Sequence, residues 1–449
     1  MSRRPFWMGV VGLWGFLLVQ AVAAQPQPNT VPPALLDPTP LDSTTADASA
    51  TRPLRLDSLF HAAAQGNPSL RVARLRSDAR EKRGDQVGAL PDPTVGGTVF
   101  SFPIVTARGE QRTQWRVQQA IPFPGKRSLR RTVADLGADV AAANADALEQ
   151  DLALRIRRAY YTLVRVQAHE RSIRRFQADL KQFEQAATSQ YEVGEEGQSA
   201  ILKAQIERQR LETRLEGLAA DRQSALQTLS RLTGREGLAR RDPVAEIGTR
   251  PETDPVEPAR ALDRRPEATK IQRRIERSER EAELAKKEQW PDVTVGVQYF
   301  DIAPADLTPA MNGRDALALS VGIKVPLWRS KQTAAIQEAE IERQRAKTEL
   351  ASFRLELRTR LSDLQQQMER REQQLTLLDE TLLPKAETAL ETTLSGYRTG
   401  QSDFLDLLDA ERTLFQLRLQ RATAYTRLLK TEAKWERAAG RVDLTGAAE

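Results

Sequence analysis

The feature that most constrains this chain of 449 residues is an internal repeat. ALPDPTVGGTVF at 89–100 aligns with QWPDVTVGVQYF at 289–300. Further along, YEVGEEGQSA at 191–200 aligns with YRTGQSDFLD at 397–406. The matches keep the same order, and the offset between the copies grows only from 200 to 206 residues. This pattern predicts one supersecondary unit built twice in tandem.

Each copy has the same internal plan: an opening helix, two short strands, and a long helical hairpin that closes in a tight turn. The predicted order is a signal peptide at 1–24, a Pro/Thr-rich disordered leader at 25–53, a first copy at 54–234, a Pro-rich joint at 235–264, a second copy at 265–440, and a tail at 441–449. In the first copy, strands are predicted at about 93–103 and 112–122 and the hairpin at 128–233. In the second copy, strands are predicted at about 292–302 and 315–325 and the hairpin at 329–439. The opening helices are predicted near 68–88 and 265–288. The predicted fold is therefore mainly α with a small β part.

The four predicted strands alternate between apolar side chains and small or polar ones. A half-buried sheet in a soluble protein alternates in the same way, but the signal peptide and the repetition favour strands that cross a membrane. The residues predicted to face lipid are Leu317, Leu319, Val321, Ile323, Val293, Val295 and Val297. Four strands cannot close a barrel around a lumen, and an open edge in lipid leaves backbone groups unpaired. Several copies must therefore each contribute four strands, and three copies give twelve.

The helical hairpins are far longer than a compact core needs. A single helix over 128–190 would measure roughly 95 Å at 1.5 Å per residue. Its apolar residues follow three-four spacing, which predicts helix-on-helix packing of the coiled-coil kind. Gly194 and Gly400 are predicted to adopt the left-handed backbone that ends the helix before each turn. Pro384 is predicted to bend or break its helix.

The N-terminus predicts export from the cytoplasm. Arg3 and Arg4 precede a short apolar stretch and a VAA cleavage-like site before Gln25, as in a signal peptide. The chain has no cysteine, which excludes disulfides, thiolate chemistry and a cysteine-linked lipid anchor. Charged residues make up 29% of the chain and alternate in sign along the helices, so we predict solvated helix faces and no nucleic-acid binding.

Together the tandem hairpins, four strands, Pro-rich joint and signal peptide resemble the TolC family of outer-membrane efflux proteins. The most specific local match is Tyr397 and Gly400 followed by Asp406, Asp409 and Ala410. FPGKR at 123–127 resembles the branch often paired with heavy-metal pumps. The resemblance implies a homotrimer with a barrel in outer-membrane lipid and a helical tunnel across the periplasm. It also implies two partners, a periplasmic adaptor (membrane fusion) protein and an inner-membrane efflux pump, in a tripartite efflux or type I secretion system.

The resemblance also assigns roles around the two hairpin turns. Asp406 and Asp409 match the aspartates of the periplasmic aperture, and Tyr397 matches a tyrosine that helps to close it. The turns, with Tyr191, Gly194, Gly400 and Ser402, would dock the adaptor or pump. Ser402 replaces an arginine of the family's best-known member, so that arginine's contact is not carried over. Asp406 and Asp409 share a helix face whatever the family, and the alternative interpretation is that they are acids favoured by a helix N-terminus.

Other function classes fit less well. His61 and His169 are the only histidines, and no nucleophile elbow, phosphate loop or metal-ligand cluster is present, so we predict no enzyme, no cofactor and no metal site. A periplasmic adaptor would have one hairpin in a β-rich body, whereas this chain has two hairpins and little β. A soluble coiled-coil scaffold would leave the alternating strands unexplained.

Overall fold

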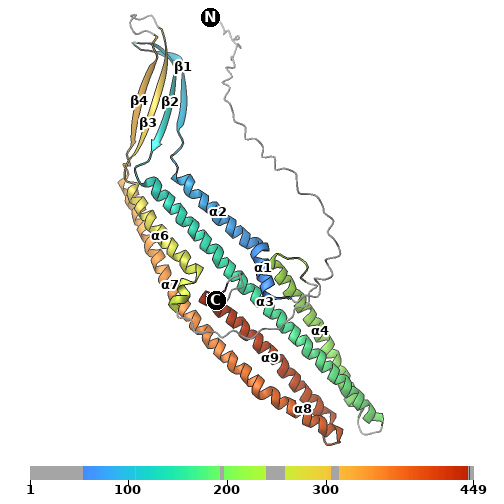
Figure 1. The fold of residues 1–449 in the computed structure, drawn as a ribbon. Coiled ribbons are helices and arrows are strands. Elements are labelled where there is room, and N and C mark those ends of the chain that lie inside the picture. The colour runs from blue at the N-terminus through green and yellow to red at the C-terminus, as the bar shows by residue number, and fades with distance from the viewer. Residues whose placement is uncertain are drawn as a thin grey trace, which may run out of the picture. The chain divides into compact units, whose positions relative to one another are not determined.

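The computed structural model describes residues 54–106, 108–192, 197–238, 258–304, 313–442 and 444. The predicted signal peptide and leader, Gly194, and most of the joint and the tail lie outside these ranges. In the described residues long helices predominate and one small antiparallel sheet is present, which confirms that part of the predicted fold class (Figure 1).

The sheet joins one strand pair from each copy of the repeat. Its strands are β1 (Thr94–Thr106), β2 (Gly109–Ile121), β3 (Asp292–Ala303) and β4 (Ala316–Lys324), which correspond to the four predicted ranges. The order is β1-β2-β3-β4, and every neighbouring pair is antiparallel. The two copies therefore meet through β2 and β3, while β1 and β4 form the two edges.

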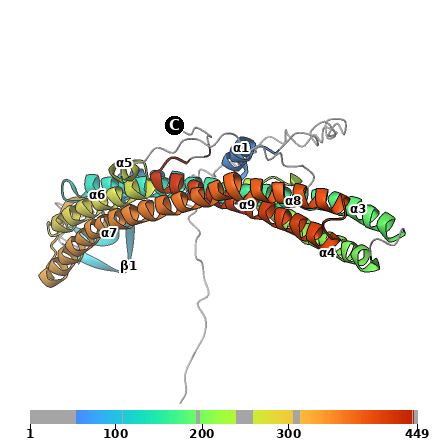
Figure 2. The same cartoon turned by 90° about the horizontal axis from the view of Figure 1, so that it is seen from below.

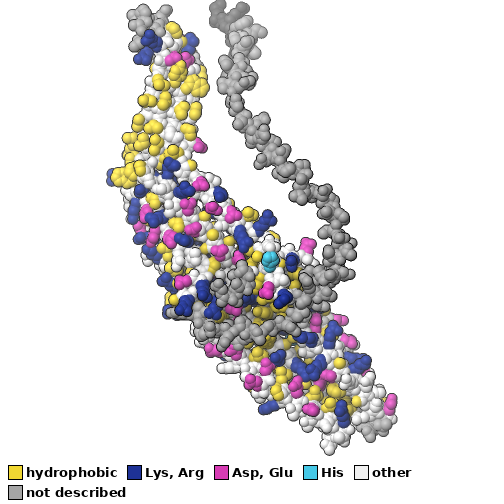
Figure 3. Space-filling view, viewed as in Figure 1, with side chains coloured by type: hydrophobic (Ala, Val, Ile, Leu, Met, Phe, Trp, Pro, Cys, Tyr) yellow, Lys and Arg dark blue, Asp and Glu magenta, His cyan; other side chains and the backbone are white. Residues whose placement is uncertain are grey.

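One face of this sheet is apolar across all four strands. Val95, Val117, Val297 and Leu319 are aligned in one row from β1 to β4. Exposure of Leu319 reaches 81%, so this row is not covered by the rest of the chain. Hydrophobic side chains gather over the sheet in Figure 3, whereas charges of both signs cover the helices.

The helices fill the rest of this part of the chain. They are α1 (Leu56–Gly66), α2 (Pro68–Gly88), α3 (Lys126–Glu192), α4 (Gln198–Thr233), α5 (Pro258–Asp263), α6 (Pro266–Lys287), α7 (Arg329–Thr376), α8 (Leu383–Arg398) and α9 (Phe404–Ala439). Helix α3 is one uninterrupted helix of 67 residues. Two short helices, α1 and α5, were not predicted from the sequence; they precede α2 and α6. Within the described ranges, no helix combines the length and the apolar character that crossing a bilayer requires.

The long helices pack side by side in a layer (Figures 1 and 2). Near the sheet the neighbours are α2–α3–α6–α7, and beyond it α4–α3–α9–α8. Helices α6 and α9 therefore follow one another along the same side of α3. Separate apolar clusters hold the layer together, one around α1, α3 and α4, one between α3 and α9, and one around α5, α7 and α9. The apolar residues form seams between helices, as the three-four spacing predicts.

Pro384 changes the helix without dividing the hairpin. A π-helical segment, Leu377–Leu382, separates α7 from α8, and Pro384 lies in the first turn of α8. Proline has no backbone N–H and its ring clashes with the carbonyl four residues earlier, so regular α-helical bonding cannot continue through it. The wider π turn accommodates both effects. Ala178, the equivalent residue of the first copy, lies within the uninterrupted α3.

The FPGKR segment joins the sheet to the helices. Lys126 Nζ lies 2.8 Å from Asp292 Oδ1 and 2.7 Å from the Trp290 carbonyl, and it is almost fully buried. The Phe123 backbone N–H donates to the same Asp292 oxygen, and the Phe123 ring stacks on Trp290 with centroids 5.3 Å apart. The first copy's FPGK thus packs against the second copy's WPD, which gives both motifs a structural role.

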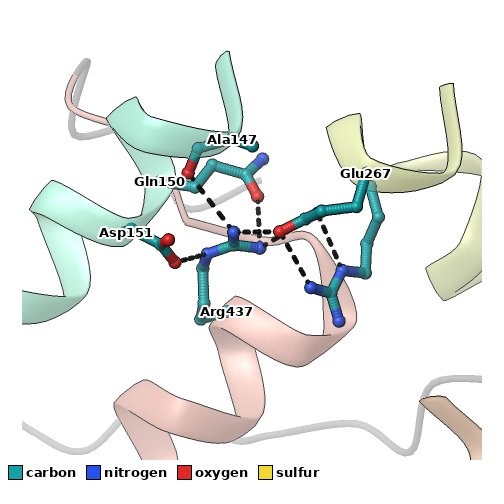
Figure 4. A network of polar contacts seen from close by, with 6 residues as sticks. Ala147, Gln150, Asp151, Glu267 and Arg437 are labelled. Carbon is teal, nitrogen blue, oxygen red and sulfur yellow. Dashed lines mark hydrogen bonds and ion pairs between the residues drawn. The ribbon is translucent and has the colours of Figure 1, made fainter. Parts of the chain in front are cut away.

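A second polar junction lies where α6 and α9 meet beside α3 (Figure 4). Arg437, at the end of α9, donates to Asp151 Oδ1 at 3.0 Å and Gln150 Oε1 at 2.9 Å on α3, and it pairs with Glu267 at the start of α6. Burial opposes ionisation of Glu267, but the hydrogen bonds from Arg265 and Arg437 lower its pKa to about 2. This buried guanidinium ties three helices from both copies.

We therefore predict that Arg437→Ala destabilises the protein by about 3 kcal/mol, because the largely buried Glu267 loses one of its two guanidinium partners and Asp151 and Gln150 lose their hydrogen bonds to it. Thermal unfolding in detergent, followed by circular dichroism, measures the effect. Arg421→Ala is the control on the same helix, since the Arg421–Asp379 pair is largely exposed. Its removal should cost at most about 1 kcal/mol. Equal losses in the two variants would contradict this account of the junction.

Candidate functional site

The turn between α8 and α9 holds the residues that the sequence singled out. Helix α8 ends at Arg398, and Gly400 has φ +75°, in the left-handed region predicted for it. The Gln401 backbone N–H donates to the Gly396 carbonyl at 2.8 Å, which closes the helix end. The Ser402 N–H donates to the same carbonyl at 3.2 Å. A side chain at Gly396 would collide with Ser402, so the turn is closely packed.

Tyr397 lies inside the turn. Its side chain is 4% exposed, and its ring packs edge-on against Phe404 with centroids 6.1 Å apart. Both rings belong to the apolar cluster between α3 and α9. In this chain Tyr397 therefore anchors the turn to the helical layer.

Unlike the buried Tyr397, the two predicted aperture aspartates lie at the surface. Asp406 and Asp409 are exposed near the start of α9. Asp403, which the sequence analysis missed, is the N-cap residue of α9, and its carboxylate accepts from the Asp406 N–H at 2.8 Å. The sequence signal for this helix cap was an aspartate directly before an apolar run. Asp403 thus caps α9, and the carboxylates of Asp406 and Asp409 face solvent.

The first hairpin ends nearby. Tyr191 is 48% exposed at the end of α3, whereas residues 193–196, with Gly194, are not described. Both described hairpin ends lie at the end of the helical layer away from the sheet (Figure 1). Arg412 on α9 pairs with Glu207 on α4 at 2.6 Å, and Arg208 pairs with Glu184 at 2.9 Å within the first hairpin. The structure therefore brings the two ends together within one chain.

A buried glutamate faces an aspartate next to this end. Glu411 on α9 is 1% exposed and faces Asp179 on α3, beside the ring pair Phe176–Phe415. Burial, reinforced by the charge of Asp179, raises the pKa of Glu411 to about 7, and Arg418 and Arg175 only partly oppose this shift. When protonated, Glu411 can donate a hydrogen bond to Asp179. The sequence signal was a glutamate within the apolar stripe of α9, and the sequence analysis missed it.

The described residues contain no group of three or more His, Asp or Glu side chains placed to hold a metal ion. His169 Nε2 lies 3.1 Å from Thr423 Oγ1 and 3.3 Å from the Leu419 carbonyl. Burial lowers the pKa of His169, which favours its neutral form. These contacts join α3 to α9, a packing role.

The second copy matches a known family model, Outer membrane efflux protein, over residues 258–441. This part of the chain is therefore similar to outer membrane efflux proteins. A curated relative is the cobalt-zinc-cadmium resistance protein CzcC of Cupriavidus metallidurans, 25% identical over 380 residues, or 83% of this chain and 86% of CzcC.

Solved structures extend the likeness in fold to most of the chain. The outer membrane protein VceC of Vibrio cholerae superposes with a TM-score of 0.69 at 21% identity, covering 86% of this chain and 96% of VceC. CusC gives a TM-score of 0.73 at 16% identity over 86% of this chain and 91% of CusC. The open MtrE channel of Neisseria gonorrhoeae gives 0.69 at 18% identity over 86% and 89%. Both copies of the repeat thus share the fold of these outer membrane proteins.

The Glu411 pKa makes stability depend on pH. The carboxyl binds more protons in the folded than in the unfolded state between pH 4.5 and about 7. Stability therefore falls as pH rises through this window, by up to about 3 kcal/mol per chain. Glu411→Gln should raise the unfolding temperature at pH 8 and flatten its dependence between pH 5 and pH 8.

Thermal unfolding of the detergent-solubilised protein at both pH values measures this. Glu391→Gln, at an exposed residue of α8, is the control and should keep the wild-type pH dependence. An unchanged slope in Glu411→Gln would show that this carboxyl does not carry the effect.

Proposed function

We propose that three copies of this chain form an outer-membrane channel, the exit duct of a tripartite efflux or type I secretion system. The observation that carries the proposal is the four-stranded sheet with one apolar face and two unpaired edge strands. Strands of 9 to 13 residues suit a tilted barrel wall. Pairing β4 of one copy with β1 of the next would close twelve strands and satisfy both edges.

The helices support the second half of the duct. Their layer continues from the sheet, its apolar residues gather in seams between the helices, and the face seen in Figure 3 carries many charged side chains of both signs. Three such layers would form a tunnel across the periplasm with water inside and out. The chain's predicted signal peptide supports export to that compartment.

The hairpin ends are the proposed docking region for a periplasmic adaptor and an inner-membrane pump. Tyr191, Gly400 and Ser402 lie there among the described residues. Exposed Asp406 and Asp409 stand on the same end, and three copies would place six carboxylates around one axis. The name of CzcC makes a metal-resistance system one candidate setting for this duct.

Membrane fractionation, with mass measurement of the solubilised protein, tests the proposal. We expect a trimer in the outer-membrane fraction that gives conductance steps in planar bilayers. A monomer in the soluble periplasm would instead favour the adaptor or coiled-coil scaffold.

The barrel proposal predicts which strand residues tolerate charge. Leu317, Leu319, Val321 and Ile323 are 62–81% exposed on the apolar face, whereas Ser320 lies on the other face. Leu319→Arg should impair assembly in the outer membrane, because a charge at mid-bilayer costs about 2–4 kcal/mol. Ser320→Arg, facing the lumen, should assemble nearly normally. Similar defects at both residues, measured by trimer yield in membranes, would refute this assignment of faces.

The aperture proposal predicts cation block. A ring of carboxylates attracts cations, so a trivalent cation should reduce single-channel current. The double variant Asp406→Ala, Asp409→Ala removes all six carboxylates and should weaken this block. Lys203→Ala, in the equivalent segment of the first copy, is the control and should retain it. Undiminished block in the double variant would mean that these residues are ordinary acids at a helix start.

A further inference from the structure

One face of the helical layer carries a concentration of positive charge that the channel fold does not explain. We call it the basic band: Arg158, Arg165, Arg371, Arg427, Lys430 and Lys434. On α9 the cations are three and four residues apart, and those on α3 are seven apart, so each set lies on one side of its helix. The band therefore runs along three neighbouring helices, α3, α9 and α7.

Contacts between the helices fix the position of the band. Lys430 Nζ of α9 donates to Thr162 Oγ1 of α3 at 2.7 Å, midway between Arg158 and Arg165. From the other side, Arg371 Nη1 of α7 donates to the Arg427 carbonyl at 2.7 Å. The cations of the three helices consequently face one another across the two seams.

Acidic partners are scarce on this face. Among the described residues, no carboxylate lies within 4.0 Å of the charged groups of Arg158, Arg371, Arg427, Lys430 or Lys434. Asp363 on α7 instead accepts from Gln367. Burial, together with neighbouring cations led by Arg165 and Arg158, lowers the pKa of Lys430 to about 8. Burial and neighbouring cations also lower the pKa of Lys434 and of Arg371. Arg165 is the exception, since its guanidinium lies 3.7 Å from Asp221 Oδ2 of α4. The band thus holds an excess of cations that repel one another.

A groove of about 510 Å³ adjoins the band. Its wall includes Arg214 of α4, Gln374 of α7, and Gln416, Gln420 and Arg427 of α9. All five side chains can donate hydrogen bonds, and the two guanidiniums suit carboxylate or phosphate oxygens. No acidic residue is among the described residues that line it.

The band lies away from the helices that cover the other side of the layer. Ile156 and Leu163 of α3 belong to the apolar cluster that includes α1. Arg158 and Arg165 each follow these residues by two positions, which is about 200° around the helix. Helices α1 and α5 lie on one side of the layer in Figure 2. The band is therefore on the side away from α1 and α5, which faces the lumen if three layers form the proposed tunnel.

We propose that the basic band and its groove bind small solutes carrying several negative charges, so that the duct passes anionic substrates of the phosphate or polycarboxylate class. This inference rests on the proposed channel function and names its substrate class. Three copies would supply eighteen cations around the lumen, which attract polyanions and repel free divalent cations. The acidic ring proposed at the hairpin ends is a separate feature and would attract cations instead of anions.

Inorganic tripolyphosphate is the probe. Added to single channels of the wild-type trimer in planar bilayers, it should reduce the current in a concentration-dependent way. The double variant Arg427→Gln, Lys434→Gln should raise the half-blocking concentration by about tenfold, equivalent to about 1.4 kcal/mol shared by two cations. Titration calorimetry with the detergent-solubilised protein should show the same loss of affinity without depending on conductance.

The matched control is Arg354→Gln, Arg358→Gln. It removes two exposed arginines from α7 on other sides of that helix and should leave block unchanged. If the channel conducts but tripolyphosphate does not block it, or if the test and control variants lose block equally, the anion site is wrong and the channel proposal stands. If no conductance steps appear, the channel proposal is contradicted. Calorimetry then tests the anion site separately, and no binding of tripolyphosphate would overturn it.

Discussion

The architecture depends on the unpaired backbone edges of a sheet that also carries an apolar face. Strands β1 and β4 each present free N–H and C=O groups, and the row from Val95 to Leu319 presents hydrocarbon. In water the apolar face is costly, and in lipid the open edges are costly. The proposed closure between copies of the chain would relieve both costs at once. The tandem repeat would supply the means, because two strand pairs joined through β2 and β3 would form one segment of a larger wall.

The helical layer follows the sheet and distributes its charges unevenly. At the junction of α6 and α9, Glu267 is surrounded by guanidiniums and its pKa falls to about 2, as expected for an ion pair that stabilises the fold. Elsewhere in the layer like charges are held together: Glu411 faces Asp179, and Lys430 faces arginines. Those arrangements cost stability, so they are the places where function, such as attraction of anions or response to pH, is most reasonably sought.

Much of this was predictable from the sequence, since it follows from local patterns. Period-two alternation located the strands, three-four spacing located the long helices, and Gly400 marked the turn. The rest depended on contacts between distant segments. Helices α1 and α5 are short, and the packing of Glu411 against Asp179 joins residues more than two hundred positions apart. The basic band combines cations from three helices, none of which is unusual in its own segment.

Cross-linking between the strand edges tests the central claim most directly. The chain has no cysteine, so paired cysteines introduced at Val95, Gly97 or Val99 of β1 and at Leu317, Leu319 or Val321 of β4 report only their own proximity. Cysteines at Val117 and Val297, which are aligned within one chain, show that oxidation works. In outer membranes, at least one β1–β4 combination should give bands of monomer, dimer and trimer on a denaturing gel run without reductant. Reduction should convert the dimer and trimer to monomer. Failure of every combination, with the internal pair oxidised, would contradict closure between copies, and a ladder extending beyond trimer would contradict the twelve-stranded barrel.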